Sequence, residues 1–491
     1  MSLDSVPEKE CISSSARPIV LVENSKTTDL AKSINRGLKK TGVFLPDSAL
    51  YKQLLEMFAR PLALTSFNVS GEPIYFDESQ IELKDYPELT IVTHNRKIEN
   101  PVDDSVLCFI NKNKIPLRMA KGVAPYTFEL PGRVKKNTLA VGGSQKVTIA
   151  LAQENSVLIS PPIGDILTLA YETYFEDFCD RLMKMYSFRP EIIMCDAHSG
   201  YYTHQWAMRK QAEWNVEVTT VYHHHAHALS LLVEHNIPID QTLFCVVWDG
   251  VGLGHDGLIR GGEFIEASYS NFNTKYSFLP FYLAGNESAI KETWKMGLSI
   301  LFQLYGESAL KRFKKFLEPF GDRVGILYTA WKNKINMPQT TSAGRLFDAA
   351  ASLLGICHIN TFEGEAAMRM EDLYDGSVDD YIEMDVIDNI NNNINNSIDW
   401  CPLFLSIIEN KETQEISYLV SIFINSMAWL IVKQAQPYGQ VGLTGGVFQN
   451  RKLLGKIIQF ANQKKVRLYL HSHIPCNDGG LSAGQVAVGL T

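Results

Sequence analysis

Two segments of the chain share one pattern, in which an apolar strand runs into a glycine-rich turn and a second strand returns. The pattern occurs at residues 139–151 and again at 243–265. Continuous apolar strands of this kind are typical of sheets that helices cover on both faces, and helical patterns are found at 166–186 and 345–355. The repeat therefore predicts an α/β protein whose larger part consists of two similar halves.

The remaining segments suggest how the domains are arranged. Residues 1–16 are polar and are expected to form a tail, and residues 17–131 are expected to form a small α/β domain. Residues 138–491 would form the larger part, with lobes at about 138–240 and 241–491.

Shorter segments complete this outline. Strand-like runs at 62–65 and 89–93 belong to the small domain, and the polar stretch 131–137, with its Gly and Pro, is the expected linker. The Asn-rich residues 388–399 are expected to form an exposed loop that interrupts the second lobe.

Composition and charge exclude several classes of protein. The formal net charge of −8 argues against an overall basic surface for nucleic acid. No apolar run approaches the roughly 20 residues that span a bilayer, and the first residues do not resemble a secretory signal. The eight cysteines form no Cys-x-x-Cys pair, so zinc ribbons are not expected and most thiols should be buried and reduced. We expect a cytoplasmic protein that binds neither membranes nor nucleic acid.

The strongest local signal is a group of histidines at the junction of a strand and a helix. Four of the twelve histidines lie between His223 and His227. In the first turn of a helix, His223 and His227 would lie on one face, close enough to share a metal ion. A solvated polar loop or stacked core histidines would be the alternative, but the His-x-x-x-His spacing favours a metal. Two imidazoles with a carboxylate suit zinc or iron.

Two carboxylates are candidates to complete such a site. Asp249 ends an apolar strand directly before glycines, and Asp478 precedes the last helical stretch. Either could ligate the metal, although Asp478 could instead serve only as a helix N-cap. A metal with an open position would polarise a carbonyl group or activate a nucleophile.

Glycine turns and polar turns are candidates for binding phosphate. Glycines at 142–143, 250–254 and 445–446 follow strands, and their backbone amides could cradle phosphates or simply allow tight packing. None matches the P-loop pattern. In the small domain, the polar groups at 65–70 and 94–96 suit a nucleotide or another anion, and ordinary turns are the alternative.

Taken together, these motifs resemble a known family. In the small domain, Thr-Ser-x-Asn-x-Ser-Gly-Glu-Pro-Ile (65–74) and His-Asn-Arg-x-Ile (94–98) resemble the YrdC-like domain, which makes acyl adenylates. In the larger part, the motifs that look like HypF-type carbamoyltransferases are His-His-His-Ala-His (223–227), Gly-Gly-Glu-Phe (261–264), Gly-Gly-Val-Phe-Gln-Asn (445–450) and Asn-Asp-Gly-Gly-Leu (477–481). The resemblance implies an incomplete YrdC-like α/β domain followed by a two-lobed TsaD-like domain of the ASKHA (actin, Hsp70 and sugar-kinase-like ATPase) fold.

The resemblance also implies an activity, cofactors and a partner. Enzymes of this family convert carbamoyl phosphate and ATP, with Mg²⁺, to carbamoyl adenylate. They then pass the carbamoyl group to the C-terminal cysteine of HypE, for the cyanide ligands of nickel–iron hydrogenase. A small-molecule O-carbamoyltransferase is one alternative, although those enzymes carry the two modules in the reverse order. A non-catalytic scaffold that binds nucleotide is the other.

Carried over residue by residue, the resemblance implies three groups of functional residues. The metal ligands would be His223, His227, Asp249 and Asp478, with the first three also catalytic. The nucleotide contacts of the larger domain would be Gly344, Asp348, Glu363, Gly445, Gly446 and Asn450. The site that forms the adenylate would use Thr65, Ser66, Asn68, Ser70, His94, Asn95 and Arg96.

The sequence also departs from the family pattern. The acylphosphatase domain, the zinc-finger-like repeats and the first half of the YrdC-like domain have no counterpart in it. We therefore expect a truncated form that keeps the transferase domain but makes carbamoyl adenylate poorly or not at all.

Overall fold

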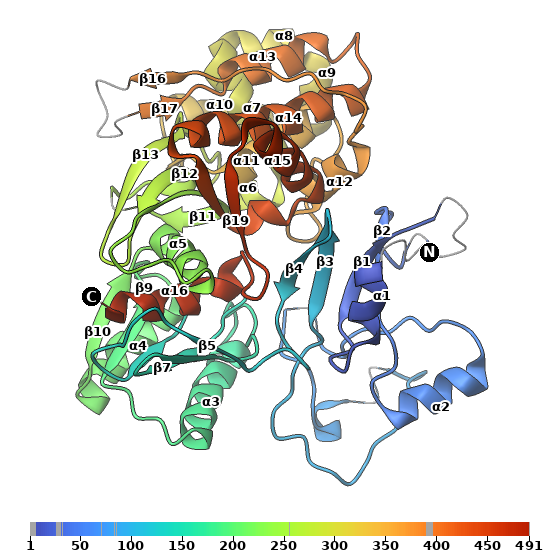
Figure 1. Ribbon diagram of the computed structural model, residues 1–491. Coiled ribbons are helices and arrows are strands. Elements are labelled where there is room, and N and C mark those ends of the chain that lie inside the picture. Colours follow the sequence, from blue (N-terminus) through green and yellow to red (C-terminus); the bar gives the residue numbers. More distant parts are fainter. Residues whose placement is uncertain are drawn as a thin grey trace. The chain divides into compact units, whose positions relative to one another are not determined.

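The computed structural model describes residues 6–25, 31, 33–69, 71–82, 84, 86–254, 256–388 and 396–490 (Figure 1). The chain divides into two compact units. The first contains Met1–Val221 together with His473–Leu490, and the second contains Tyr222–Ser472. The division therefore falls after Val221 rather than near residue 240, and the last helix returns to the first unit.

The first unit begins with a small sheet in the order β2-β1-β3-β4. Its strands are β1 (Ile19–Glu23), β2 (Lys40–Val43), β3 (Val106–Ile110) and β4 (Asn113–Arg118). Helix α1 (Val6–Ser13) packs on this sheet, because Ile12 is buried with Val20, Val22 and Phe109. The structure thus corrects the expectation of a tail, since residues 6–13 form a helix whose Ile12 is part of the core.

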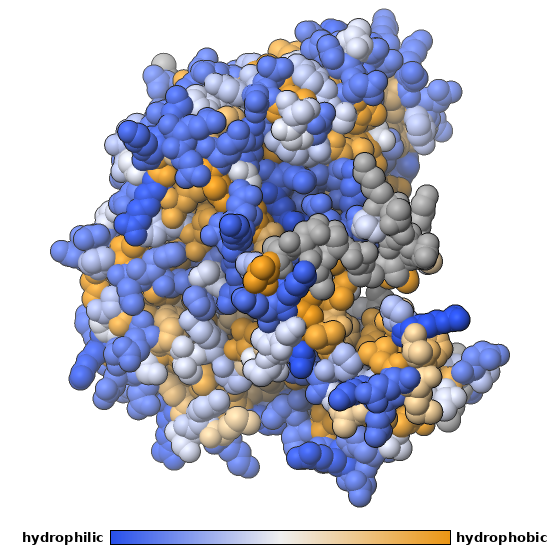
Figure 2. Space-filling view, turned by 45° about the vertical axis from the view of Figure 1, so that its right-hand side comes forward, coloured by the Kyte–Doolittle hydropathy of each residue, from blue (hydrophilic) through white to orange (hydrophobic). Residues whose placement is uncertain are grey.

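The middle of the predicted small domain packs little. None of the described residues from 42 to 104 is buried, and the runs 62–65 and 89–93 form no strand. Regular elements in this stretch include α2 (Ala49–Phe58) and a 3-10 turn, η1 (Glu78–Gln80). The surface of the molecule carries apolar side chains among polar ones (Figure 2), and α2 exposes Leu50 and Met57. This stretch therefore lacks the packed frame that the sequence suggested.

A second sheet of the first unit has the order β10-β9-β6-β7-β8-β5, with β6, β9 and β10 parallel. Its strands are β5 (Tyr126–Glu129), β6 (Thr138–Ala140), β7 (Ala150–Gln153), β8 (Ser156–Ile159), β9 (Ile192–Asp196) and β10 (Glu217–Val221). Helices α3 (Leu169–Met185) and α4 (Tyr202–Trp214) share one apolar core with it, and α16 (Leu481–Ala487) contacts β6 to β9. Helix α3 confirms the helix expected at 166–186, and Thr168 caps its start.

The second unit is built on a sheet whose main order is β16-β17-β13-β12-β11-β18-β19. Its strands are β11 (Leu243–Leu253), β12 (Ile259–Ala267), β13 (Phe272–Phe278), β14 (Phe281–Tyr282), β15 (Gln339–Thr340), β16 (Val386–Asp388), β17 (Asn396–Ile398), β18 (Gln440–Thr444) and β19 (Arg467–Leu470). Strands β11 and β12 are the predicted strand and its return, and β18 lies parallel to β11. The end of β18, at Thr444, therefore lies beside Val247 in the middle of β11.

Helices make up the rest of the second unit. They are α5 (His223–Glu234), α6 (Ser288–Lys291), α7 (Thr293–Tyr305), α8 (Ala309–Arg312), α9 (Lys314–Leu317), α10 (Arg323–Lys332), α11 (Ala343–Leu353), α12 (Glu365–Leu373), α13 (Cys401–Asn410), α14 (Ile416–Ala435) and α15 (Arg451–Lys464). Helix α11 confirms the helix expected at 345–355. The expected Asn-rich loop lies largely outside the described residues, between β16 and β17.

One helical segment resembles a membrane span in length and composition. Among the described residues it is Ile416–Tyr438, but 72% of its apolar window is buried. Helix α14, which forms most of it, packs against α12, α13 and α15. The segment therefore has the surroundings of a core helix.

Candidate metal and nucleotide site

Helix α5 carries the predicted histidines on its first turn. The side chains of His223 and His227 are buried, and their ring centroids lie 4.9 Å apart. His225 turns elsewhere, because its Nε2 contacts the backbone oxygen of Ser268 at 2.8 Å. The helix thus presents His223 and His227 together, as their spacing predicted.

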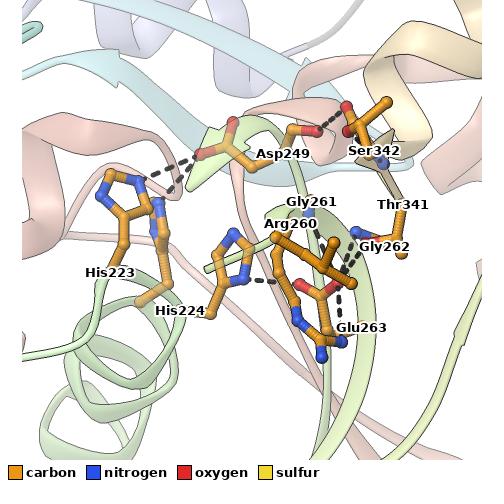
Figure 3. Close-up of polar contacts among 12 residues, drawn as sticks. His223, His224, Asp249, Arg260, Gly261, Gly262, Glu263, Thr341 and Ser342 are labelled. Atoms are coloured by element: carbon orange, nitrogen blue, oxygen red, sulfur yellow. Dashed lines mark hydrogen bonds and ion pairs between the residues drawn. The ribbon is translucent and has the colours of Figure 1, made fainter. Parts of the chain in front are cut away.

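Asp249, on β11, faces both of these histidines (Figure 3). Its Oδ2 lies 3.1 Å from Nε2 of His227 and 3.5 Å from Nε2 of His223. Burial acts to raise the pKa of Asp249, but the hydrogen bonds and charge of His223 and His227 outweigh it and hold the pKa well below its usual value. Asp249 is therefore an ionised acceptor aimed at two imidazoles.

These three side chains fit a transition metal. Their candidate ligand atoms lie within 4.8 Å of one another, and all three residues are buried. Two imidazole nitrogens and a carboxylate oxygen form a donor set that suits zinc or iron, and the geometry does not distinguish the two. The metal prediction agrees with this arrangement.

Asp478 belongs to the other compact unit. It opens the 3-10 turn η7 (Asp478–Gly480), and the residue that caps this turn is Asn477, whose side chain accepts the N–H of Gly479. The alternative role of Asp478 as a side-chain cap is therefore taken by its neighbour. Its role as the fourth ligand stays a prediction.

Three of the predicted nucleotide-binding glycines surround Asp249. The N–H of Gly446 donates to Oδ1 of Asp249 at 3.2 Å. A Cβ at Gly344 would lie 3.3 Å from the backbone oxygen of Asp249. Gly445 has a φ of 104°, and a Cβ there would collide with the backbone of Trp248. The chain thus approaches β11 closely at Trp248 and Asp249.

The other predicted nucleotide contacts of this unit have partners of their own. Oδ2 of Asp348 pairs with Nε of Arg345 at 2.7 Å, and burial raises the pKa of Asp348. Oδ1 of Asn450 accepts the backbone N–H groups of Lys452 and Leu453 at the start of α15. Glu363 is exposed. Their contacts with a nucleotide stay predictions.

The glycine turn at 142–143 does not fit a phosphate cradle. The N–H of Gly142 donates to Oε1 of Gln485 at 2.8 Å, and Nε2 of Gln485 donates to the oxygen of Gly142 at 3.0 Å. Because α16 already occupies this backbone, the prediction of a phosphate cradle is wrong for Gly142. The turn serves packing instead, which was the alternative.

The residues predicted to form the adenylate are not assembled into a site. Thr65, Ser66, His94, Asn95 and Arg96 are exposed, and Asn68 is half-buried. Their hydrogen bonds are local, such as Oγ of Ser66 to Oδ1 of Asn68 at 2.9 Å and the N–H of Arg96 to Nδ1 of His94 at 3.1 Å. Ser70 lies outside the described residues. This second site stays a prediction.

A layer of polar residues behind the metal ligands was not assigned by the sequence. Glu263 is 1% exposed and bonds to His224 and Thr341. Burial acts to raise the pKa of Glu263, but the nearby His224 and Arg260 and the hydroxyl of Thr341 outweigh it and lower the pKa. The available signal was an acid that directly follows two glycines within a predicted strand.

Fold and site together define a class of protein, which consists of a YrdC-type domain followed by a Kae1-like domain of two subdomains. Family models match each part. The "Telomere recombination" model of the Sua5, YciO and YrdC type matches residues 4–120. The "HypF Kae1-like domain" model matches residues 133–234, and the model for the second subdomain of the carbamoyltransferase Kae1-like domain matches residues 245–485.

Individual relatives are similar to nearly the whole of this chain. The chain is 32% identical to the carbamoyltransferase HypF of Synechocystis sp., over 98% of this chain and 64% of that protein. It is 31% identical to the probable carbamoyltransferase HypF of Methanocaldococcus jannaschii, over 97% of this chain and 62% of that protein. The chain thus spans somewhat less than two thirds of the length of these curated relatives.

Solved structures agree with this assignment. A crystal structure of full-length HypF in its phosphate- and nucleotide-bound form matches with a TM-score of 0.91 and 32% identity, over 99% of this chain and 76% of that one. The crystal structure of T. kodakarensis HypF matches with a TM-score of 0.88 and 27% identity, over 99% of this chain and 64% of that one. The chain belongs to the HypF family of carbamoyltransferases, and the expected mixed α/β fold is confirmed.

Proposed function

We propose that this chain transfers a carbamoyl group from carbamoyl adenylate to the C-terminal cysteine of HypE, in the maturation of nickel–iron hydrogenase. The observation that carries the proposal is the convergence of His223, His227 and Gly446 on the carboxylate of Asp249. This convergence places the candidate metal ligands next to a glycine turn, in a chain that belongs to the HypF family. We propose a cytoplasmic location for the protein.

The metal would be zinc or iron, held by His223, His227 and Asp249, with Asp478 as the proposed fourth ligand. When bound, it would supply Lewis-acid polarisation of the carbamoyl carbonyl group. The chain's own contribution is orientation. The N–H of Gly446 fixes one oxygen of Asp249 and the hydroxyl of Ser342 donates to the backbone oxygen of the same residue at 2.8 Å.

The proposed reaction exchanges one bond to the carbamoyl carbon for another. The thiolate sulfur of HypE attacks this carbon, so that a carbon–sulfur bond forms and the bond to the phosphate oxygen of the adenylate breaks. AMP leaves with the electron pair of that bond. We propose that AMP is held by Gly344, Gly445 and Gly446 next to Asp249, and by Asp348, Glu363 and Asn450.

Two other functions compete with this proposal. One is transfer to the hydroxyl group of a small molecule, and the other is a scaffold that binds nucleotide and HypE without catalysis. We propose the transferase because the candidate ligands of the metal are buried together, which a scaffold would not need.

The test incubates the chain with synthetic carbamoyl adenylate and HypE, followed by mass spectrometry of the C-terminal peptide of HypE. A mass gain of one carbamoyl group is expected, and it should be absent for HypE without its C-terminal cysteine and for the His223→Ala variant. Binding of HypE without any mass gain would overturn the proposal in favour of the scaffold.

The fourth ligand has a separate test. If Asp478 ligates the metal, Asp478→Asn should weaken metal binding in equilibrium titrations and leave the secondary structure, measured by circular dichroism, unchanged. Equal affinity in the variant and the parent would remove Asp478 from the ligand set.

A further inference from the structure

Glu263 is a buried carboxylate that joins three elements of the second unit (Figure 3). It lies on β12, and its Oε2 is 2.5 Å from Nδ1 of His224 on the first turn of α5. Its Oε1 accepts the hydroxyl of Thr341 at 2.6 Å. One side chain thus ties the helix of the candidate ligands to the segment that leads into α11.

The residue after Thr341 is Ser342, and it contacts β11, the strand that carries the candidate ligand Asp249. Ser342 donates its hydroxyl to the backbone oxygen of Asp249 at 2.8 Å and accepts the N–H of Arg345 at the start of α11. Both Thr341 and Ser342 are fully buried. Thr341 therefore contacts α5 through Glu263, and its neighbour Ser342 contacts β11 directly.

Glycines allow the backbones to come this close. A Cβ at Gly262 would collide with the backbone oxygen of Thr341, and a Cβ at Gly261 would lie 2.6 Å from the backbone oxygen of Asp249. A Cβ at Gly252 would lie 2.6 Å from Nε2 of His224. The Gly-Gly-Glu motif is thus explained by packing around Asp249 and Thr341, with no bound ligand required.

His224 belongs to this arrangement and differs from its neighbours in role. Nδ1 of His224 is the ring nitrogen that faces Glu263, and it lies 2.5 Å from Oε2 of this carboxylate. Its Nε2 lies against Gly252. His224 is therefore the contact through which Glu263 holds the first turn of α5.

We propose that Glu263, Thr341 and Ser342 form a brace that positions His223, His227 and Asp249 for metal binding. The inference rests on the proposed metal site and adds three positioning residues to it. Residues that orient metal ligands from behind commonly contribute about 10–100-fold to metal affinity, because misplaced ligands cannot converge on one ion. The brace contacts both α5 and β11, which carry the candidate ligands. Its loss should therefore let the ligands on these two elements move relative to each other.

The test compares metal binding by the full chain and its variants. Metal-free protein is titrated with Co²⁺, whose visible d–d absorption reports the number and arrangement of its ligands, and Zn²⁺ affinity is measured by competition. Thr341→Val removes only the hydroxyl that Glu263 accepts and should weaken binding about 10–100-fold with an altered Co²⁺ spectrum. Thr341→Ser restores a hydroxyl and should recover both the affinity and the spectrum. Glu263→Gln should behave like Thr341→Val.

Thr293→Val provides a matched control. Thr293 is equally buried in the same unit, and its hydroxyl donates to the backbone oxygen of Cys357 at 2.7 Å. This variant loses a buried hydrogen bond of the same kind without touching the brace, so it should keep the parental affinity and spectrum. Thermal unfolding of every variant shows whether it folds. If Glu263→Gln does not fold, the comparison of Thr341→Val with Thr341→Ser tests the proposal.

Failure of this inference is distinguishable from failure of the proposed metal site. If the parent chain binds neither Co²⁺ nor Zn²⁺, the metal site itself is wrong. If the parent binds metal and Thr341→Val binds it equally well with the same spectrum, the brace is refuted while the metal site stands.

Discussion

At the scale of single residues, Asp249 is held in place from several sides. Its Oδ2 faces His223 and His227, its Oδ1 accepts from Gly446, and its backbone oxygen accepts from Ser342. A carboxylate with this many partners keeps its orientation without a metal ion. A ligand fixed in this way loses little conformational entropy when the metal binds.

Substitution of the candidate histidine ligands should abolish tight metal binding. We expect His223→Ala and His227→Ala each to weaken Zn²⁺ binding by more than the roughly 100-fold upper range for supporting residues, because a ligand itself is removed. Elemental analysis after dialysis and competition titrations measure the effect. His235→Ala is the control, since His235 follows the same helix and its Nε2 bonds to the backbone oxygen of Leu470. Equal metal loss in the control would show that disturbance of α5, and not ligation, is the cause.

The reactivity of the cysteines should follow their burial. Burial raises the pKa of the Cys195 thiol to about 12 and raises that of the Cys245 thiol further, and only the thiolate reacts with alkylating reagents. Burial also raises the pKa of Cys11 and raises that of Cys401 to about 12, so access to the reagent sets the order, and in the native protein at pH 8 a maleimide should modify the partly exposed Cys11 and Cys401 before the six buried cysteines. Peptide mass spectrometry over time gives the order. Rapid labelling of Cys245 in folded protein would contradict the packing of β11.

At the scale of elements, the glycine turn after β18 determines how closely this strand's end approaches β11. We expect Gly445→Ala to lower the free energy of unfolding by at least about 2 kcal/mol, because the added Cβ collides with the backbone of Trp248 at a φ that favours glycine. Urea unfolding measures it.

Gly439→Ala is the matched control for that substitution. Gly439 also has a positive φ, of 65°, but a Cβ there would meet nothing within 4 Å. We expect a cost of about 1 kcal/mol from the backbone conformation alone. Similar losses in the two variants would show that the contact with Trp248 has no energetic role.

Helix α1 should stabilise the first unit. Ile12→Ala removes a buried side chain from the cluster with Val20 and Phe109, and we expect a loss of about 2–5 kcal/mol. Hydrogen exchange of β1 and β3 measures the local effect. Val6→Ala, on the same helix but 67% exposed, should change little. If the two variants exchange alike, α1 does not pack on the sheet in solution.

At the scale of the whole molecule, the two proposed half-reactions should differ in rate. Residues 42–104 contain no buried position among those described, whereas the candidate metal ligands His223, His227 and Asp249 of the second unit are buried. We expect transfer from synthetic carbamoyl adenylate, but little pyrophosphate exchange that depends on carbamoyl phosphate, ATP and Mg²⁺. Exchange as fast as transfer would show that Thr65, Asn68 and Arg96 form a working site in this chain.

Local patterns in the sequence were sufficient for the fold class and for the centre of the site. The apolar strands predicted β11 and β12, and the spacing of His223 and His227 predicted that both would lie on one face of the helix, close to each other. These features depend on periodicities of a helix and a strand, which operate between residues close in the chain. The motifs also pointed correctly to the HypF family.

What the sequence alone did not determine depends on contacts between distant segments. Whether a glycine amide is free or occupied depends on its partner, as Gly142 and Gln485 illustrate across 343 positions. The pairing of Glu263 with Thr341 likewise joins residues 78 positions apart. Which polar residues are buried, and therefore which must hold one another, is decided only when the chain has packed, since desolvation gives these hydrogen bonds their importance.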